Sequence, residues 1–201
     1  LMRTFQRAFF RAGIPLKHTE GFNPHPFISI ALPLSVGYSS QCEILEFVLL
    51  DGVPREAVPR RLTAAMPEGI LVHSCYPAER KLKELTYVNY IINMEYEEGR
   101  PQETETALKN LLSRDSLVVR KKSKKAKAGF TEVDLIPLIH SWNIQCQRDA
   151  MTLSADLRAQ NPGLNPELIR ASFCEAYPEL APDFVTFHRR EVLDADGKPF
   201  R

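Results

Sequence analysis

Apolar residues in this chain recur at helical and strand-like spacings, and the two spacings alternate in nearly the same order in each half. The N-terminal half predicts, in turn, a helix over 2–12, strands over 27–32 and 43–50, a helix over 59–66 and a strand over 70–76. A repeat of about 3.6 residues is typical of an amphipathic helix, and a repeat of two is typical of a half-buried strand. Helices and strands that alternate in this way pack as layers around a core, so we expect an α+β fold.

One element is missing from the order of the N-terminal half. The series helix, strand, strand, helix, strand becomes βαββαβ, the ferredoxin-like unit, when one strand is placed before residue 1. The sequence opens directly in the helical pattern of Met2, Phe5 and Phe9. We therefore expect the first unit to lack its opening strand and an N-terminal piece to be missing.

The C-terminal half predicts a second unit of the same kind with an inserted segment. Its expected elements are a strand over 85–96, a helix over 103–112, a strand over 117–121, a hairpin over 142–157, a helix over 165–176 and a strand over 184–192. Asn165 followed by Pro166 is a typical helix start, because the asparagine side chain caps the helix and proline fits its first turn. The sequence thus predicts two ferredoxin-like units, over 1–80 and 81–201.

Basic residues are clustered, although the net charge is only +1. Three arginines recur every four residues on the first predicted helix, and a second cluster occupies 120–127. Arginine and lysine neutralise RNA phosphates and release their counterions, so clusters of this kind favour RNA binding. The residues that we expect to contact RNA are Arg3, Arg7, Arg11, Lys121, Lys122, Lys124 and Lys125. A solvated surface and a docking site for an acidic protein are the alternative interpretations.

A loop rich in glycine, proline and asparagine follows the first helix, and we expect it to line the functional cleft. Its residues are Gly21, Phe22, Asn23, Pro24, His25 and Pro26. Each proline restricts the residue before it, so the loop should hold one backbone path. His18 and His25 could act as general acid and base near neutral pH. Alternatively, His25 fixes the shape of the loop by hydrogen bonding; a metal site that adds Glu43 is not required by the spacing.

Several classes of function have no support in the sequence. No apolar run is long enough for a membrane span, and no signal peptide opens the chain. The four cysteines form no zinc or iron–sulfur motif. Neither a glycine-rich phosphate loop nor a G-x-S-x-G motif occurs. We therefore expect a cytoplasmic protein without a cofactor or a metal.

Three stretches near the N-terminus carry a resemblance to a known family. They are Leu1 to Gly13, the run Gly-Phe-Asn-Pro-His-Pro-Phe-Ile-Ser that begins at Gly21, and the run Ala-Leu-Pro-Leu-Ser-Val-Gly that begins at Ala31. Together they resemble the radical-SAM-associated (radical-SAM-linked) family of uncharacterised bacterial proteins. In that family a strand and a short turn precede the first helix, and this chain lacks both.

The resemblance implies partners rather than a reaction. Members of the family are fused to, or encoded beside, a cobalamin-binding radical-SAM protein, and they neighbour genes for a ribonuclease of the E/G class and for ribosomal proteins. We therefore expect a non-catalytic accessory module that binds tRNA or rRNA beside a radical-SAM RNA-modifying enzyme. The alternatives are a metal-independent ribonuclease that uses His18 and His25, and a pure protein-docking domain.

Overall fold

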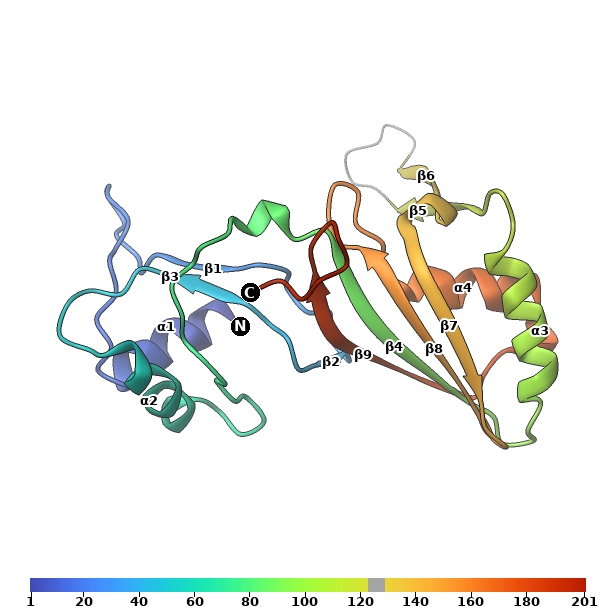
Figure 1. Ribbon diagram of the computed structural model, residues 1–201, viewed down its shortest axis with the longest axis horizontal. Helices are drawn as coiled ribbons and strands as arrows, with labels where there is room; N and C mark the ends of the chain where they lie inside the picture. Colours follow the sequence, from blue (N-terminus) through green and yellow to red (C-terminus); the bar gives the residue numbers. More distant parts are fainter. Residues whose placement is uncertain (123–128) are drawn as a thin grey trace. The chain divides into compact units, whose positions relative to one another are not determined.

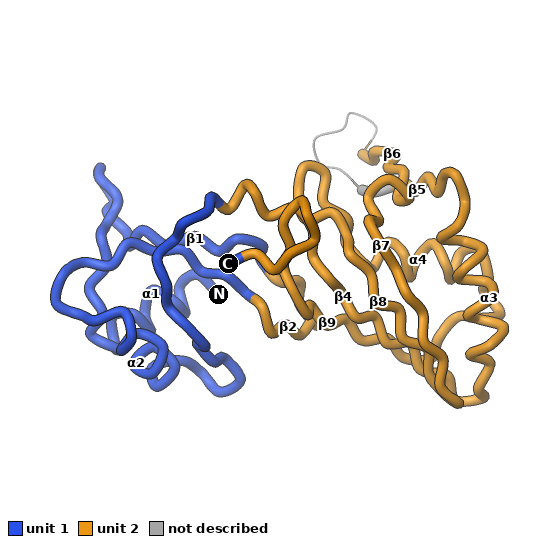
Figure 2. Tube along the Cα trace, viewed as in Figure 1, with its two compact units in different colours: residues 1–33, 43–81, 201 blue, residues 34–42, 82–200 orange. Residues whose placement is uncertain are grey.

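The computed structural model spans residues 1–201 and describes all of them except 123–128. Within the described residues the protein is α+β, with four α-helices and three small or medium-sized sheets. The chain divides into two compact units (Figure 2). Unit 1 comprises 1–33, 43–81 and residue 201, and unit 2 comprises 34–42 and 82–200.

Unit 1 packs two helices against a small sheet. Its elements are α1 (Met2–Arg11), β1 (Ile28–Ile30), β3 (Leu45–Phe47) and α2 (Val58–Ala65). The apolar face of α1 buries Ala8 and Phe9, and the Phe9 ring lies 4.9 Å from the ring of Phe47. Gly13, directly beyond the helix cap, has a φ of +62°, which is the left-handed conformation that glycine adopts readily at a helix end.

The sheet of unit 1 is a short antiparallel ladder. β1 pairs with β3, and the ladder continues where Lys17 donates its amide hydrogen to the carbonyl oxygen of Val48. The predicted strands over 27–32 and 43–50 therefore pair with each other, although each regular strand is shorter than its predicted range. The other edge of β3 has no partner strand within the described residues.

The predicted strand over 70–76 is wrong. No residue of this segment belongs to a strand, and the Val72 amide donates to the side-chain oxygen of Thr63 instead of to a neighbouring strand. Val72 and Cys75 nevertheless pack against the core of unit 1. Packing of these two residues does not make a strand, because a ladder also needs an adjacent strand edge, and no strand of the described residues pairs with this segment.

Unit 2 is built on a five-stranded sheet that carries two helices on one face (Figure 1). The strands lie in the order β2 (Ser39–Ser40), β9 (Phe184–Leu193), β4 (Tyr87–Glu95), β8 (Ala150–Arg158) and β7 (Ile139–Cys146). β2 runs parallel to β9, and every other neighbouring pair is antiparallel. α3 (Pro101–Leu112) and α4 (Pro166–Ala176) cover the same face.

The alternation of side chains along β8 separates the two faces of this sheet. Met151, Leu153, Ala155 and Leu157 are buried, whereas the residues between them are only half-buried. Successive side chains of a strand point to opposite faces, so the residues between the buried ones lie on the face without helices. This helix-free face therefore receives the polar residues of β8.

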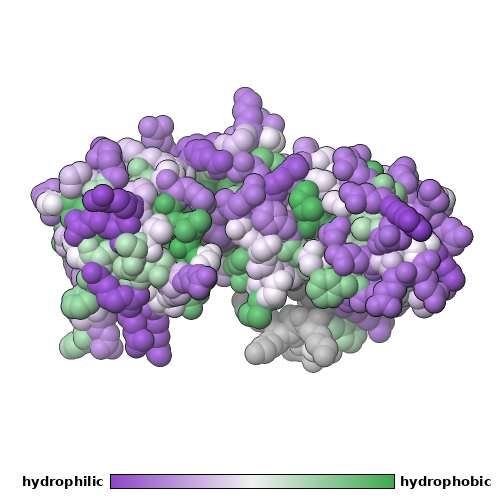
Figure 3. Space-filling model, turned by 90° about the horizontal axis from the view of Figure 1, so that it is seen from below, coloured by the Kyte–Doolittle hydropathy of each residue, from purple (hydrophilic) through white to green (hydrophobic). Residues whose placement is uncertain are grey.

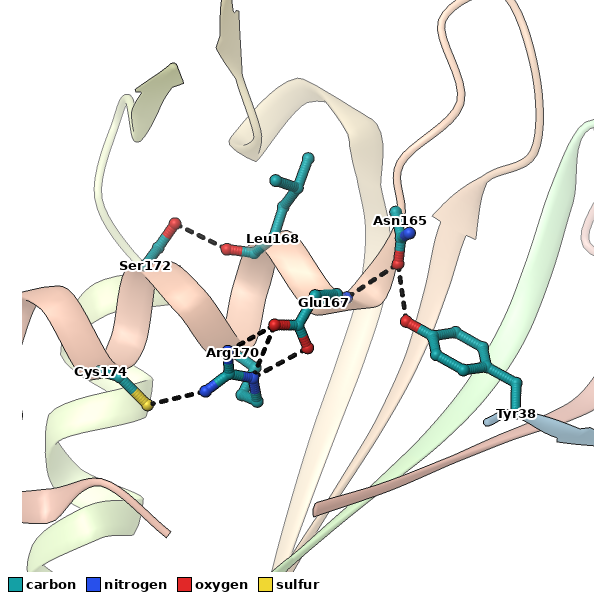
Figure 4. A network of polar contacts seen from close by, with 7 residues as sticks. All are labelled: Tyr38, Asn165, Glu167, Leu168, Arg170, Ser172 and Cys174. Carbon is teal, nitrogen blue, oxygen red and sulfur yellow. Dashed lines mark hydrogen bonds and ion pairs between the residues drawn. The ribbon is translucent and has the colours of Figure 1, made fainter. Parts of the chain in front are cut away.

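A separate hairpin of β5 (Val118–Lys122) and β6 (Phe130–Asp134) lies beyond the end of the sheet where β7 begins (Figure 1). The helix α4 begins as the sequence predicts, because the Asn165 side-chain oxygen accepts the amide hydrogen of Glu167 at 3.0 Å. The same oxygen accepts the hydroxyl hydrogen of Tyr38 at 2.8 Å (Figure 4). The bond from Tyr38 ties the first turn of α4 to the segment 34–42, and within that turn Glu167 pairs with Arg170.

Stability should fall at alkaline pH because two tyrosines are harder to ionise in the folded protein. Burial, with a further contribution from the charge of Glu167, raises the pKa of Tyr38 to about 12, and burial raises the pKa of Tyr96 to about 12. The unfolded chain ionises these phenols near a pKa of about 10. Above that pH the unfolded state loses protons first, so the free energy of unfolding decreases as the pH rises from 10 towards 12 and is unaffected below that range.

Phenolate absorbance measured against pH on the native protein checks this expectation. Tyr38→Phe should remove one late-ionising phenol from the titration, while Tyr76→Phe, which changes an exposed tyrosine of unit 1, should leave the late step intact. Native titration of all tyrosines near pH 10 would contradict the expectation.

Candidate functional site

The loop after α1 is a closed hairpin held by main-chain and side-chain bonds. His18 pairs with Pro26 across its base, and the Thr19 amide donates to the carbonyl oxygen of His25 at 2.9 Å. The His25 amide donates in return to the Thr19 hydroxyl at 3.2 Å. Residues 20–25 are all exposed, and Phe22 stands fully in solvent near the tip.

Both histidines of this loop use one ring nitrogen to hold the backbone. His18 Nδ1 lies 3.0 Å from the carbonyl oxygen of Leu16, which can only accept, so this nitrogen donates. His25 Nδ1 lies 3.2 Å from the carbonyl oxygen of Asn23 and 3.1 Å from the Thr19 hydroxyl. The contacts therefore favour the interpretation in which His25 fixes the shape of the loop.

The three arginines of α1 do not share one environment. Arg3 and Arg7 are exposed, whereas the Arg11 guanidinium donates to the carbonyl oxygen of Ala65 at 2.5 Å, at the end of α2. Arg61, which the sequence did not single out, binds the Ala12 carbonyl oxygen from Nε at 3.1 Å and from Nη2 at 2.7 Å. Arg11 and Arg61 thus join the two helices of unit 1.

The second basic cluster is only partly described. Lys121 and Lys122 belong to β5, where their backbones pair with Thr131 and Phe130. Lys124 and Lys125 lie outside the described residues. Arg120 is exposed, lies 4.9 Å from the centre of the Phe130 ring, and forms an ion pair of 3.5 Å with Glu132. Because the clusters belong to different units, we treat each as a separate surface.

A polar network that the sequence did not predict lies on the helix-free face of unit 2. At its centre, Asp156 of β8 accepts one hydrogen bond at each carboxylate oxygen. Asn89 of β4 donates from Nδ2 to Oδ1 at 2.5 Å, and the Ser141 hydroxyl of β7 donates to Oδ2 at 2.6 Å. These three residues face one another because Asp156 is the register partner of both Asn89 and Ser141.

Asn89 is the least accessible polar residue of this network. Its exposed fraction is only 7%, and its Oδ1 finds no hydrogen-bond donor among the described residues. A buried polar atom without a partner costs about 1–3 kcal/mol. If the amide were turned over, its oxygen would face the Asp156 carboxylate oxygen. Both atoms are acceptors, so no hydrogen bond could form between them. The bond to Asp156 therefore fixes Asn89 in the orientation that leaves its own oxygen unpaired.

A stacked aromatic pair lies beside this network. The rings of Tyr87 on β4 and His140 on β7 are 4.4 Å apart and inclined by only 22°. The two strands flank β8, so the rings meet over that strand, where Arg158 is the register partner of Tyr87 and Asp156 lies two residues before Arg158. A register shift between Ile139 and Ser141 supplies the extra residue that turns the His140 ring towards Tyr87. His140 is exposed to solvent.

The opposite end of the same sheet has the wrong charge for a polyanion. An open hollow there lies between the end of β4, the turn from β7 to β8 and the start of β9. Its lining includes four carboxylates and one arginine: Glu95, Glu97, Asp149, Asp183 and Arg148. Phosphates are repelled by such a surface, so this end of the sheet is unsuited to a polyanion.

The described residues offer neither a metal site nor a membrane helix. Among them, no group of three or more histidine, cysteine, aspartate or glutamate side chains could hold a metal ion. None of their helices has the length and apolar character needed to cross a bilayer. Figure 3 shows one face of the protein, on which hydrophilic residues surround apolar patches.

Comparison with known proteins gives a family but no activity. No curated protein matches the chain. The model of one family, described as "Uncharacterized protein conserved in bacteria (DUF2344)", matches residues 1–166. This match covers all of unit 1 up to residue 81 and most of unit 2, including the residues around Asp156. The chain therefore belongs to this uncharacterised bacterial family, DUF2344.

Proposed function

We propose that the chain is a non-catalytic module that binds single-stranded RNA on the helix-free face of unit 2. The observation that carries the proposal is the combination of the Tyr87–His140 stack with the polar network of Asp156. Proteins recognise unpaired RNA bases by stacking them on aromatic rings and by hydrogen bonding to their edges. This face offers a ring and fixed hydrogen-bonding groups side by side.

The strand order of unit 2 supports the same proposal. We infer that unit 2 is a ferredoxin-like fold, because the order β9-β4-β8-β7 with antiparallel neighbours and both helices on one face is the βαββαβ arrangement. One class of RNA-binding domain uses a four-stranded sheet of this kind and stacks bases on its exposed aromatic residues. Unit 1, with two helices and one strand pair, would be an incomplete copy of the same fold.

Phosphate contacts would come from basic residues outside the stack. Arg158 is the register partner of Tyr87 and is exposed, so it is suited to hold the phosphate next to a stacked base. Arg3 and Arg7 of unit 1 are exposed and would contact RNA phosphates as a separate surface. Each such contact makes binding weaker as salt increases, because counterions are released.

RNA affinity of His140→Ala tests the proposal directly. We expect this variant to lose roughly tenfold or more in affinity for short single-stranded RNA, because one stacked base contributes about 1–3 kcal/mol. His140 is exposed, so the substitution should leave the fold intact. Fluorescence anisotropy with labelled oligonucleotides, titrated at several salt concentrations, measures the change.

Gln145→Ala is the matched control, because Gln145 is an exposed residue of the same strand near its other end. We expect it to bind RNA as the unaltered chain does. Equal losses in both variants, or no RNA binding by the unaltered chain at low salt, would contradict the proposal. Sizing of the RNA after the titration separates binding from cleavage.

The biological setting that we propose is the cytoplasm, with tRNA or rRNA as the ligand and a cobalamin-type radical-SAM RNA-modifying enzyme as the partner. The resemblance near the N-terminus supports this setting. An enzyme that modifies a large RNA benefits from a separate surface that positions the substrate, since phosphate contacts position and base contacts specify. Co-elution of the purified chain with such an enzyme, with and without RNA, tests the partnership.

A further inference from the structure

We propose that Asp156 selects guanine at the stacking site beside it. This inference rests on the proposed function, since it names the base that the helix-free face of unit 2 would recognise. The preference for guanine is argued from the number of acceptor positions that remain unoccupied on the Asp156 carboxylate.

A carboxylate has two oxygens and about four acceptor positions in total. Asn89 occupies one position on Oδ1, and Ser141 occupies one on Oδ2. By this count one acceptor position remains on each oxygen, and we take these two as the positions that a ligand fills together. The ligand that fits them offers two neighbouring N–H donors and no acceptor between them.

Among the four RNA bases, only guanine offers this pattern on its Watson–Crick edge. Its N1–H and its N2 amino group are adjacent donors. Adenine and cytosine each place a ring-nitrogen acceptor next to their amino group, and uracil places a carbonyl acceptor on each side of N3–H. An acceptor that faces an ionised carboxylate is repelled, so Asp156 disfavours these three bases as well as favouring guanine.

The neighbouring residues hold the carboxylate ready for such a contact. Asn89 is 7% exposed and cannot turn over without losing its bond to Asp156. Ser154, the neighbour of Asp156 on the same face of β8, lies 3.4 Å from the same Asn89 nitrogen. The carboxylate therefore needs little reordering when a ligand arrives, which favours affinity.

The position of the stack decides which part of the RNA reaches Asp156. Tyr87 and Asn89 are two residues apart on β4, so their side chains lie roughly 7 Å apart on the same face. His140 directly precedes Ser141 on β7. A base that stacks on the exposed ring of His140 would therefore share this face of the sheet with the carboxylate, and we propose that this base or its neighbour turns its edge to Asp156.

The test compares oligouridylates that carry one central nucleotide: guanosine, inosine, adenosine or uridine. We expect the unaltered chain to bind the guanosine oligomer roughly tenfold more tightly than the uridine oligomer, since a good bidentate contact to a base edge has about this effect or more. Inosine keeps N1–H but lacks the amino group, so its oligomer should fall between the two. This comparison needs no altered protein.

Asp156→Asn provides the second arm. The amide presents a donor in place of one acceptor, so the preference for guanosine over uridine should disappear. The readout is the ratio of the two affinities, because Asp156 belongs to the proposed binding face and its substitution can also change the affinity for both oligomers. Asp149→Asn is the matched control, because Asp149 is an exposed aspartate in the turn at the far end of the sheet. It should retain the preference in full.

The outcomes separate this inference from the proposed function. RNA binding without a preference for guanosine, or a preference that Asp156→Asn leaves unchanged, overturns the inference and leaves RNA binding standing. No binding of any oligomer by the unaltered chain overturns the proposed function itself.

Discussion

Phe9→Ala should unfold unit 1 while the sheet of unit 2 persists. Phe9 is 2% exposed and packs with Ala8, Ile14, Leu16 and Leu62 in the core of that unit. Removing a buried phenylalanine side chain costs about 3–5 kcal/mol, because apolar contacts are lost and a cavity is left. Domains are stable by only about 5–15 kcal/mol, and a unit with so few buried side chains is expected near the lower end.

Hydrogen exchange followed by mass spectrometry checks this result, because it reports each segment separately. Peptides from α1, β1, β3 and α2 should lose protection, and peptides from β4 and β8 should keep it. Phe10→Ala is the matched control: Phe10 is the next residue of the same helix, but it is 87% exposed. If Phe9→Ala reduced the protection of unit 1 as little as Phe10→Ala does, the assigned core would be contradicted. Loss of protection in both units would show that the two units unfold together.

Phe173→Ala should have an effect of similar size on unit 2. Phe173 lies on α4, is fully buried, and its ring contacts that of Tyr177 at 5.6 Å. The helix lies on the helix-covered face of the sheet (Figure 1), so a cavity beneath it removes apolar packing from that face. We expect a loss of about 3–5 kcal/mol in the free energy of unfolding.

Chemical denaturation followed by tryptophan fluorescence is suited to this measurement, because the only tryptophan, Trp142, lies on β7 of the same sheet. Phe184→Ala is the control, since Phe184 belongs to the same unit but is 59% exposed. If the two variants had equal denaturation midpoints, α4 would contribute no more to the stability of unit 2 than an exposed side chain does.

Much of the local structure could be predicted because its signals lie within a few residues. The apolar spacing of α1, the cap at Asn165 and the hairpin turn between β7 and β8 all depend on neighbours in the sequence. The segment 70–76 shows the limit of this approach. Its apolar residues indicated a strand, and Val72 and Cys75 do pack against the core of unit 1. Ladder formation, however, depends on whether another strand lies beside the segment, and no local residue encodes that.

The candidate site could not be predicted for the same reason. Asn89, Ser141 and Asp156 come from three strands, and only the register of β4, β8 and β7 brings them together. The register shift that turns His140 towards Tyr87 also has no obvious signal in the sequence. The one available clue was the polar series Thr152, Ser154 and Asp156 at every second position of β8, which is typical of any half-exposed strand.

The route of the chain also affects the order in which the protein can be completed during synthesis. The segment 34–42 leaves unit 1, contributes β2 and Tyr38 to unit 2, and returns to unit 1 at residue 43. Its partner strand is β9, and Ser39 and His188 are 149 positions apart. At a ribosomal rate of about 5–20 residues per second, β2 waits on the order of ten seconds for β9 to emerge. Unit 1 can form around both ends of this segment in the meantime, so the last step of folding joins one of the final strands to one of the first.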